Sequence, residues 1–286
     1  MMMDKKLCEY RFDELLNKHT SFKIGGCARI FVRPRSIEAL ICALERFQHA
    51  KILAKGTNVL APDEGVDIVI NTLGLNKHQI KNDLIISEAG VLLSTLCRKA
   101  ADHGLSGLEF AYGIPGTIGG AVYMNAGAYD GEICDIVEYV EVYDRKNIIR
   151  LDKSQMNFSY RSSILKETDW VVLRVALRLK PSNSQAVRDR MEQIMRKRIQ
   201  TQPLDLPSAG SVFKRPRKDF YVGRAIEQIG LKGLRVGDAQ ISTKHAGFIV
   251  NLGNAKASDV KELIKIIQQE VYKNYGIHLE PEVEIW

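Results

Sequence analysis

The glycine-rich stretch from Gly113 to Glu132, which reads GIPGTIGGAVYMNAGAYDGE, constrains the fold of this chain more than any other segment. Its twenty residues include six glycines, so a long piece of backbone has no side chain and can adopt positive φ angles. Such backbone is typical of segments that approach a ligand closely, although tight turns that merely connect elements have a similar composition. Asn125 and Tyr129 favour a ligand, because a connector needs neither their amide nor their ring.

The length of the chain predicts more than one domain. At 286 residues it exceeds the usual size of a single core, which favours two or three domains that share one ligand. The composition, 45% hydrophobic and 26% charged, is typical of a soluble globular protein. The first residues, MMMDKKLCEYRFDELLNKH, contain no apolar signal segment, and no later stretch reaches the ~18 apolar residues of a membrane span. We therefore expect a cytoplasmic protein with no membrane partner.

The cysteines and histidines predict neither disulfides nor a metal site. The five cysteines are scattered and form no Cys-x-x-Cys pair, and none of the six histidines has metal-ligand spacing. Cys97 and the neighbouring leucines are spaced as on one face of a helix, which favours a thiol in the core over a reactive one.

The charge balance favours an anionic partner. Lys and Arg number 41 against 34 Asp and Glu, a net charge of +7, which suits nucleic acid or a phosphorylated small molecule. The densest basic cluster, residues 188–198, lies on a predicted helix whose polar face needs only solvent, and no nucleic-acid motif is present. We expect small phosphorylated molecules as partners and no nucleic acid; the oligomeric state stays open.

Hydrophobic periodicity and turn residues predict alternating strands and helices. Ser36 is a candidate N-cap, Gly104 and Gly276 are candidate helix stops, and residues 181–184 resemble a boundary. The predicted strands cover residues 28–32, 52–54, 67–71, 84–87, 137–143, 170–179, 245–251 and 279–286, and the predicted helices cover residues 37–47, 91–103, 185–201, 223–229 and 258–275.

A second glycine-containing segment, Lys55 to Asn58, follows a predicted strand. Neither this segment nor Gly113–Glu132 fits G-x-G-x-x-G or G-x-x-x-x-G-K-[ST], so the sequence excludes a Rossmann dinucleotide site and a P-loop. Two separate loops that cradle one extended diphosphate remain compatible with the pattern.

Eight motifs occur along the chain in a familiar order. With them, the sequence resembles the UDP-N-acetylenolpyruvoylglucosamine reductases, also called UDP-N-acetylmuramate dehydrogenases, of peptidoglycan synthesis and hence of cell-wall biogenesis, cell shape and cell division. The resemblance covers nearly the whole chain. The motifs are TSFKIGG, KGTNVL, GIPGTIGGAVYMNAGAY, FSYRSSILK, PSAGSVFKRP, AIEQIGLKG, KHAGFIVN and LEPEVEIW.

The resemblance implies an α+β fold: a two-lobed FAD-binding domain of the vanillyl-alcohol-oxidase-like (PCMH) type and an α+β C-terminal domain that binds the substrate. We expect an N-terminal segment at residues 1–21, the FAD-binding domain at 22–182 with lobes of about 22–54 and 55–182, and the substrate-binding domain at 183–286. No room exists after Arg161 for the long tyrosine-bearing loop of one family subtype, so the chain resembles the shorter, second subtype.

The implied cofactor is non-covalent FAD, because neither glycine segment contains a histidine, and the implied co-substrate is NADPH. Small hydroxyls and unencumbered backbone amides suit a pyrophosphate. Thr57 replaces the serine usual in the family and keeps the hydroxyl. The implied FAD contacts are Gly56, Thr57, Asn58, Gly116, Gly119, Gly120, Asn125 and Ala126.

The implied reaction is the NADPH-dependent, FAD-mediated reduction of UDP-N-acetyl-3-O-(1-carboxyvinyl)-glucosamine to UDP-N-acetylmuramate. Arg161 matches the family's catalytic arginine, which polarises the carboxylate. Ser211 matches the serine that protonates the α-carbon, although without the family a serine after Gly210 is more typical of a turn. Glu282 matches the glutamate that assists charge stabilisation, and Glu280 and Glu284 would share its face of a regular strand.

Lys214 and Gln228 match positions that contact the sugar nucleotide in relatives. Two departures from the family pattern leave the local electrostatics open: Arg215 replaces a frequent asparagine, and Glu284 replaces a frequent arginine. Two other functions compete with this hypothesis. One is a flavin oxidase of the same fold acting on another substrate, and the other is a basic nucleic-acid-binding module without catalysis, whose affinity would fall steeply with salt.

Overall fold

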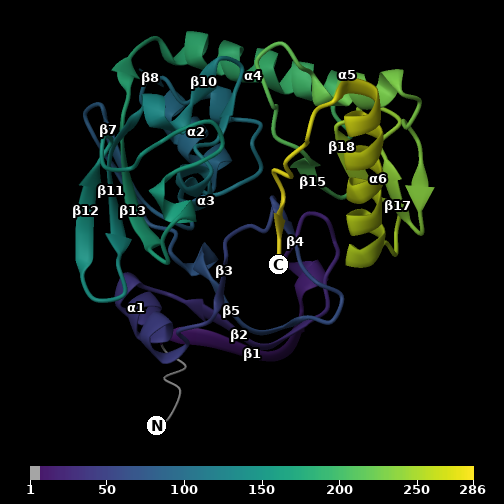
Figure 1. Ribbon diagram of the computed structural model, residues 1–286. Helices are drawn as coiled ribbons and strands as arrows, with labels where there is room; N and C mark the ends of the chain where they lie inside the picture. Colours follow the sequence, from purple (N-terminus) through teal and green to yellow (C-terminus); the bar gives the residue numbers. More distant parts are fainter. Residues whose placement is uncertain (1–6) are drawn as a thin grey trace. The chain divides into compact units, whose positions relative to one another are not determined.

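The computed structural model describes residues 7–286, a mixture of helices and strands (Figure 1). These residues form two compact units. Unit 1 comprises Ile30–Lys55, Ile68–Lys197 and the described residues up to Arg11, and unit 2 comprises Phe12–Arg29, Gly56–Asp67 and Arg198–Trp286. The expected domain boundaries near residues 22 and 183 stay predictions, and the first six residues of the expected N-terminal segment lie outside the described part.

The main sheet of unit 1 has five strands in the order β12-β11-β13-β7-β6, and all neighbours are antiparallel. The three inner strands agree with the predicted strands at 84–87, 137–143 and 170–179. The two edge strands were not predicted, because β12 and β6 bury almost no continuous face. The bounds are β6 (His78–Lys81), β7 (Leu84–Glu88), β11 (Val137–Tyr143), β12 (Ile148–Asp152) and β13 (Val171–Arg178).

Two helices, α2 (Leu93–Asp102) and α3 (Ile118–Tyr123), share one hydrophobic core with this sheet (Figure 1). Gly104 follows α2 with φ +63°, which confirms it as the helix stop. Cys97 of α2 is 1% exposed inside the core, as predicted, and burial raises the pKa of its thiol far above the ordinary range. Short strand pairs complete this part: β8 (Leu105–Ser106) with β14 (Lys180–Pro181), and β9 (Gly127–Ala128) with β10 (Gly131–Glu132).

A second core forms around helix α1 (Ile37–Arg46). Ser36 accepts a hydrogen bond from the backbone N–H of Ala39 at 3.2 Å, so the predicted N-cap is confirmed. A four-stranded sheet runs in the order β1-β2-β5-β3. Its bounds are β1 (Cys8–Leu15), β2 (Cys27–Pro34), β3 (Lys51–Leu53) and β5 (Val66–Asn71); β1 falls in the expected N-terminal segment and was not predicted.

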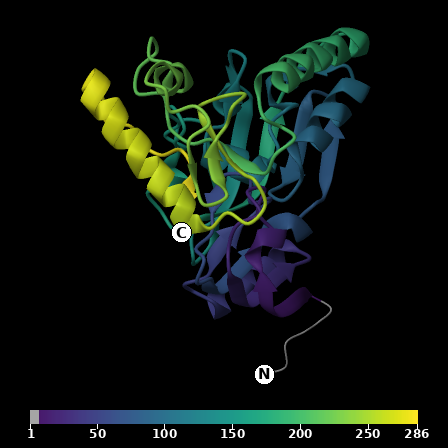
Figure 2. The ribbon, with the colours of Figure 1, turned by 90° about the vertical axis from the view of Figure 1, so that its right-hand side faces the viewer.

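The main sheet of unit 2 runs in the order β15-β18-β17-β16, and helix α6 (Ala257–Tyr275) lies alongside its strands (Figures 1 and 2). The apolar stripe of α6 is buried, as predicted, and Gly276 ends the helix with φ +65°. Phe22, Ile24 and Leu60 enter the same core from early parts of the chain. The strands are β15 (Ser208–Ser211), β16 (Arg235–Val236), β17 (Ala239–Ile241) and β18 (Phe248–Asn251).

Short strands, two further helices and 3₁₀ turns complete the described part of the chain. Among residues 7–286, no helix has the length and apolar character needed to cross a membrane. The elements are β4 (Val59–Leu60), which pairs in parallel with β19 (Glu284–Ile285), the helices α4 (Ser184–Thr201) and α5 (Val222–Gln228), and the 3₁₀ turns Leu16–Lys18, Thr72–Gly74, Glu109–Ala111, Ile133–Asp135 and Ile164–Lys166.

Candidate functional site

The glycine-rich stretch of unit 1 is folded rather than an open loop, since it contains α3, β9 and β10. Thr117 caps α3 by accepting a hydrogen bond from Gly120 N at 3.3 Å. Gly119 lies against Ala89, where an added Cβ would stand 2.8 Å from the Ala89 Cβ. Two of the predicted cofactor glycines therefore also build the helix and its packing.

The expectation of unencumbered amides is wrong at four of the predicted positions. Gly116 N donates to Ile114 O at 2.9 Å, Gly119 N to Ala89 O at 2.9 Å, and Ala126 N to Ala121 O at 2.8 Å; Gly120 N is held by Thr117. Protein acceptors take these donors because the segment folds on itself. What the glycines still offer is close approach: a Cβ on Gly120 would have only the Thr117 hydroxyl nearby, at 3.6 Å.

Asn125 is completely buried, and its side-chain amide is engaged by the protein. Its Nδ2 donates to Glu132 Oε2 at 3.2 Å and to Ser159 O at 3.0 Å, while its Oδ1 accepts from Cys134 N at 3.0 Å. Any contact that Asn125 makes with a flavin must therefore use other atoms than the two amide hydrogens.

Arg161 lies in a tight turn between Ser159 and Ser162, which exchange two backbone hydrogen bonds of 3.1 Å. Its φ of +55° is uncommon for a residue with a side chain. The half-buried guanidinium donates from Nη2 to Gly127 O at 2.9 Å and lies 5.0 Å from the centre of the exposed Tyr160 ring. The turn thus presents the predicted catalytic arginine beside the glycine-rich stretch.

Gly56, in unit 2, has no room for a side chain. Its φ is +65°, and a Cβ would stand 2.2 Å from His19 O. Its carbonyl accepts from Ser21 N at 2.9 Å. Next to half-buried Thr57, Asn58 donates from Nδ2 to Glu282 O at 2.9 Å, and its own carbonyl accepts from Glu284 N at 2.9 Å. The first predicted cofactor loop is therefore bonded to the C-terminal segment that carries Glu282.

Ser211 is exposed at the end of β15. The β15–β18 register shifts between Ser208 and Ser211, and Gly210 within this bulge has φ +80° with nothing within 4 Å of an added Cβ. A bulge re-aims the side chain that follows it. Immediately after it, Glu282 N donates to Val212 O at 2.7 Å, so unit 2 brings the chain at Ser211 and the half-buried Glu282 together.

The three alternating glutamates have different surroundings. Glu280 forms an ion pair with Lys214, whose backbone N also donates to Glu280 O at 2.9 Å. Glu284 lies in β19, while Glu282 lies between them, opposite Val212. The predicted strand at 279–286 is confirmed only at residues 284–285, with one isolated bridge between Phe213 and Pro281.

Gln228, at the end of α5, accepts a hydrogen bond from the Tyr275 hydroxyl at 3.2 Å. It lines a cavity of about 320 Å³ together with residues of both charge signs and three aromatic rings. Lys214 is not among the lining residues. The cavity is lined by Arg217, Asp219, Phe220, Tyr221, Arg224, Ala225, Gln228, Tyr275 and Ile277.

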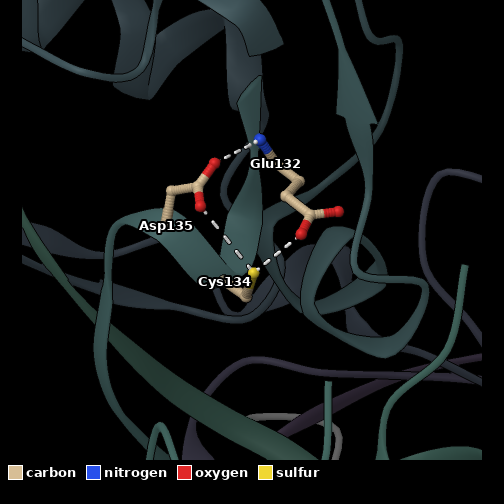
Figure 3. Close-up of side chains that lie close together, drawn as sticks. All are labelled: Glu132, Cys134 and Asp135. Atoms are coloured by element: carbon tan, nitrogen blue, oxygen red, sulfur yellow. Dashed lines mark hydrogen bonds between the residues drawn. The ribbon is translucent and has the colours of Figure 1, made fainter. Parts of the chain in front are cut away.

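Glu132, Cys134 and Asp135 form a cluster of potential metal ligands (Figure 3). The Cys134 thiol contacts Glu132 Oε1 at 3.0 Å and Asp135 Oδ1 at 4.0 Å, and Asp135 accepts from Glu132 N at 3.0 Å. Partial burial and then the Glu132 hydrogen bond raise the pKa of the thiol to about 11. The protonated thiol is a poor metal ligand, and the contacts cap the 3₁₀ turn that begins at Ile133. That the protein has no metal site stays a prediction.

The sequence did not single out the side chains that hold the site residues in place. Ser159 and Ser163 contact Asn125 and Tyr123 only because the fold brings residues 123–134 and 157–163 together, and Glu132 contacts Asn125 across a turn of seven residues. No spacing rule could have identified them.

Two domain families match this chain. Residues 28–150 match an FAD binding domain, and residues 202–286 match the C-terminal domain of UDP-N-acetylenolpyruvoylglucosamine reductase. The first match includes both glycine segments, and the open space beside Gly120, with the Thr57 hydroxyl, fits close approach of such a cofactor. The expected α+β fold with an FAD-binding domain is confirmed.

Relatives and a solved structure match over almost the whole chain. The UDP-N-acetylenolpyruvoylglucosamine reductase of Pseudothermotoga lettingae is 60% identical over 99% of this chain and 100% of its own length, and that of Thermosipho melanesiensis is 52% identical over 97% and 96%. The crystal structure of the reductase (MurB) from Thermus caldophilus has a TM-score of 0.85, 39% identity and coverage of 98% of both chains. This chain therefore belongs to the UDP-N-acetylenolpyruvoylglucosamine reductase family of FAD-dependent oxidoreductases.

Proposed function

We propose that this chain uses NADPH and non-covalent FAD to reduce the enolpyruvyl sugar nucleotide UDP-N-acetyl-3-O-(1-carboxyvinyl)-glucosamine to UDP-N-acetylmuramate, a cytoplasmic step of peptidoglycan synthesis. One local arrangement in the structure carries the proposal. Exposed Ser211 lies at a β-bulge directly before Val212, whose carbonyl accepts a hydrogen bond from the backbone N–H of Glu282. The names of relatives that match 97–99% of the chain support the substrate.

The proposed FAD contacts are those implied by the sequence, Gly56, Thr57 and Asn58 in unit 2 and Gly116, Gly119, Gly120, Asn125 and Ala126 in unit 1. Gly120 admits the cofactor because it carries no side chain and only the Thr117 hydroxyl lies within 4 Å of an added Cβ, and the Thr57 hydroxyl is able to donate to a phosphate oxygen. When bound, FAD supplies the hydride that it accepts from NADPH.

Arg161 stabilises the charge that develops on the substrate carboxylate. Hydride addition to the β-carbon of the enolpyruvyl group leaves negative charge on the α-carbon, delocalised into the carboxylate. A guanidinium held in a fixed direction binds a carboxylate through two donors. Arg161 meets this need, because its turn and its bond to Gly127 O set its direction before the substrate arrives.

Ser211 donates the proton to the α-carbon. A serine hydroxyl is a weak acid in water, but a carbanion is a stronger base than an alkoxide, so the transfer runs downhill. The backbone N–H of Glu282 donates to Val212 O, next to Ser211 in sequence, and the Glu282 carboxylate assists the arginine in distributing charge.

Lys214 and Gln228 bind the sugar nucleotide. Lys214 is held by Glu280, which leaves ammonium hydrogens for a phosphate oxygen. Gln228 lines the 320 Å³ cavity, which contains two arginines and three aromatic rings. Arginines and aromatic rings suit the phosphates and the base of a nucleotide.

The test is an anaerobic absorbance experiment on the purified protein reconstituted with FAD. We expect a flavin spectrum that NADPH bleaches and the enolpyruvyl sugar nucleotide restores, with the lactyl ether as product. A protein that takes up no FAD contradicts the proposal. The oxidase alternative predicts a different result. The enolpyruvyl compound would leave the flavin bleached, oxygen would restore its spectrum, and an alcohol or sugar would reduce it.

A further inference from the structure

We propose that Asn125 is a positioning residue for Arg161, holding the turn that carries the arginine in its strained conformation. The proposal rests on the function proposed above, in which Arg161 binds the substrate carboxylate. It gives Asn125 a role in directing the arginine that is separate from its predicted contact with FAD.

The turn needs support from its surroundings. Arg161 has φ +55°, a left-handed conformation that is unfavourable for a residue with a Cβ. Such conformations persist where neighbouring groups over-determine them. The two backbone hydrogen bonds between Ser159 and Ser162 close the turn but leave its direction relative to the glycine-rich stretch open.

Three hydrogen bonds tie this turn to residues 123–127, and Asn125 makes the central one. Asn125 Nδ2 donates to Ser159 O at 3.0 Å, Arg161 Nη2 donates to Gly127 O at 2.9 Å, and Ser163 Oγ donates to Tyr123 O at 2.9 Å. The Asn125 bond is a side-chain bond to the carbonyl that also accepts from Ser162 N. It therefore supports the hydrogen bond that closes the turn.

The orientation of the Asn125 amide is fixed by its partners. Its Nδ2 faces two acceptors, Glu132 Oε2 and Ser159 O, and its Oδ1 faces a donor, Cys134 N. A flipped amide would oppose oxygen to both acceptors and hydrogen to the donor. Because Asn125 is completely buried, water does not compensate for a lost partner.

Asn125→Asp is the sharpest perturbation, because it has the same shape and keeps the acceptor for Cys134 N. It removes both donors and sets a carboxylate against Glu132 and the Ser159 carbonyl. The double variant N125D/E132Q returns an amide–carboxylate pair between positions 125 and 132 but leaves Ser159 O without its donor. The double variant therefore lacks the hydrogen bond to the arginine turn but has no repulsion between two carboxylates within the glycine-rich stretch.

Stopped-flow spectroscopy of the FAD-loaded variants tests the proposal. In N125D/E132Q, we expect flavin reoxidation by the enolpyruvyl substrate to be slowed ~10-fold or more beyond any change in flavin reduction by NADPH in the same variant, because small displacements of a positioned group cost rates of this order. In an Arg161→Ala background, N125D/E132Q should slow flavin reoxidation by less than a further ~2-fold, since the effects of two residues that act through one contact are not additive.

Hydrogen exchange of the protein without FAD supplies a readout that does not depend on activity. Peptides covering residues 157–163 should exchange faster in N125D/E132Q than in the wild type, because the Ser159–Ser162 bonds lose their support. Peptides of helix α6, which belongs to unit 2, should exchange as in the wild type, which excludes a general loss of stability.

The outcomes separate the two proposals. If Arg161→Ala leaves reoxidation unchanged, the proposed role of Arg161 fails. If Arg161→Ala slows reoxidation and N125D/E132Q does not, or if the two effects multiply fully, the positioning role of Asn125 is overturned. Loss of FAD binding or of folding in both N125D and N125D/E132Q also overturns it, because Asn125 would then hold the glycine-rich stretch rather than the arginine.

Discussion

At the scale of single residues, position 56 requires glycine for two separate reasons. Its φ of +65° disfavours any side chain, and a Cβ would stand 2.2 Å from the backbone oxygen of His19. We expect Gly56→Ala to lower the free energy of unfolding by about 1–2 kcal/mol for the conformation and by a further ~1–3 kcal/mol for the overlap. Urea unfolding of the FAD-free protein measures the sum.

Gly230→Ala is the matched control for this prediction, because Gly230 has φ +76° but nothing within 4 Å of an added Cβ. It should show the conformational cost alone. Equal losses in the two variants would contradict the overlap at position 56.

The half-buried ring of His245 predicts a dependence of stability on pH. Burial, and next the charge of Lys232, lower the pKa of His245 below its ordinary value. As the pH falls below about 6.5, the unfolded chain takes up the proton first, so the stabilisation present at neutral pH is lost as the pH falls towards the folded pKa. Between pH 7.5 and 5.5, the wild type should therefore lose more unfolding free energy than His245→Gln. The same loss in both proteins would show that His245 does not contribute.

The residues of the site could be matched to a family pattern, but their partners could not be predicted. Arg161, Ser211 and Glu282 each stand in a motif made of consecutive residues. Their supports are separated from them along the chain: Gly127 holds Arg161, and Val212 pairs with Glu282. The same limitation produced the wrong expectation of open amides, because Ala89 and Ile114 accept from the glycines only in the folded chain.

At the scale of elements, Asp63 caps helix α6 across a large sequence separation. Its Oδ1 accepts from Ala257 N at 2.7 Å and its Oδ2 from Ser258 N at 3.0 Å. We expect Asp63→Ala to cost about 1–2 kcal/mol, since the carboxylate satisfies two amides and faces the positive end of the helix dipole. Thermal unfolding measures the loss.

Asp67→Ala is a suitable control for the cap, because Asp67 forms an ion pair with Arg29 in which the two side chains are 79% and 77% exposed. Such a pair contributes less than about 1 kcal/mol. A larger loss at position 67 than at position 63 would rule out the capping role.

The elements that were predicted are those with a strong buried face. The helices at 37–47, 185–201 and 258–275 agree with α1, α4 and α6 within about one residue at each end. Helix α3 was missed because its sequence IGGAVY has poor helix propensity, and one of its two glycines, Gly119, is explained by packing against Ala89. Strands β6 and β12 were missed because they lie at the sheet edges and alternate too weakly.

At the scale of the whole molecule, unit 2 depends on early parts of the chain. Phe22, Ile24 and Leu60 are at most 2% exposed and belong to the core around α6. A fragment of residues 183–286 lacks these side chains, so we expect it to show no cooperative thermal transition. In the full chain, Phe22→Ala should cost about 3–5 kcal/mol. Cooperative unfolding of the fragment with little loss of stability would contradict the assignment of these residues to its core.

The central claim is that Ser211 protonates the substrate after hydride transfer, and Ser211→Ala tests it most directly. In stopped-flow measurements on the FAD-loaded protein, flavin reduction by NADPH should stay within ~2-fold of the wild type, while reoxidation by the enolpyruvyl substrate should slow ~100-fold or more. Ser208→Ala, on the same strand, should change neither rate. Equal slowing of both half-reactions by Ser211→Ala, or unchanged reoxidation, would contradict the account.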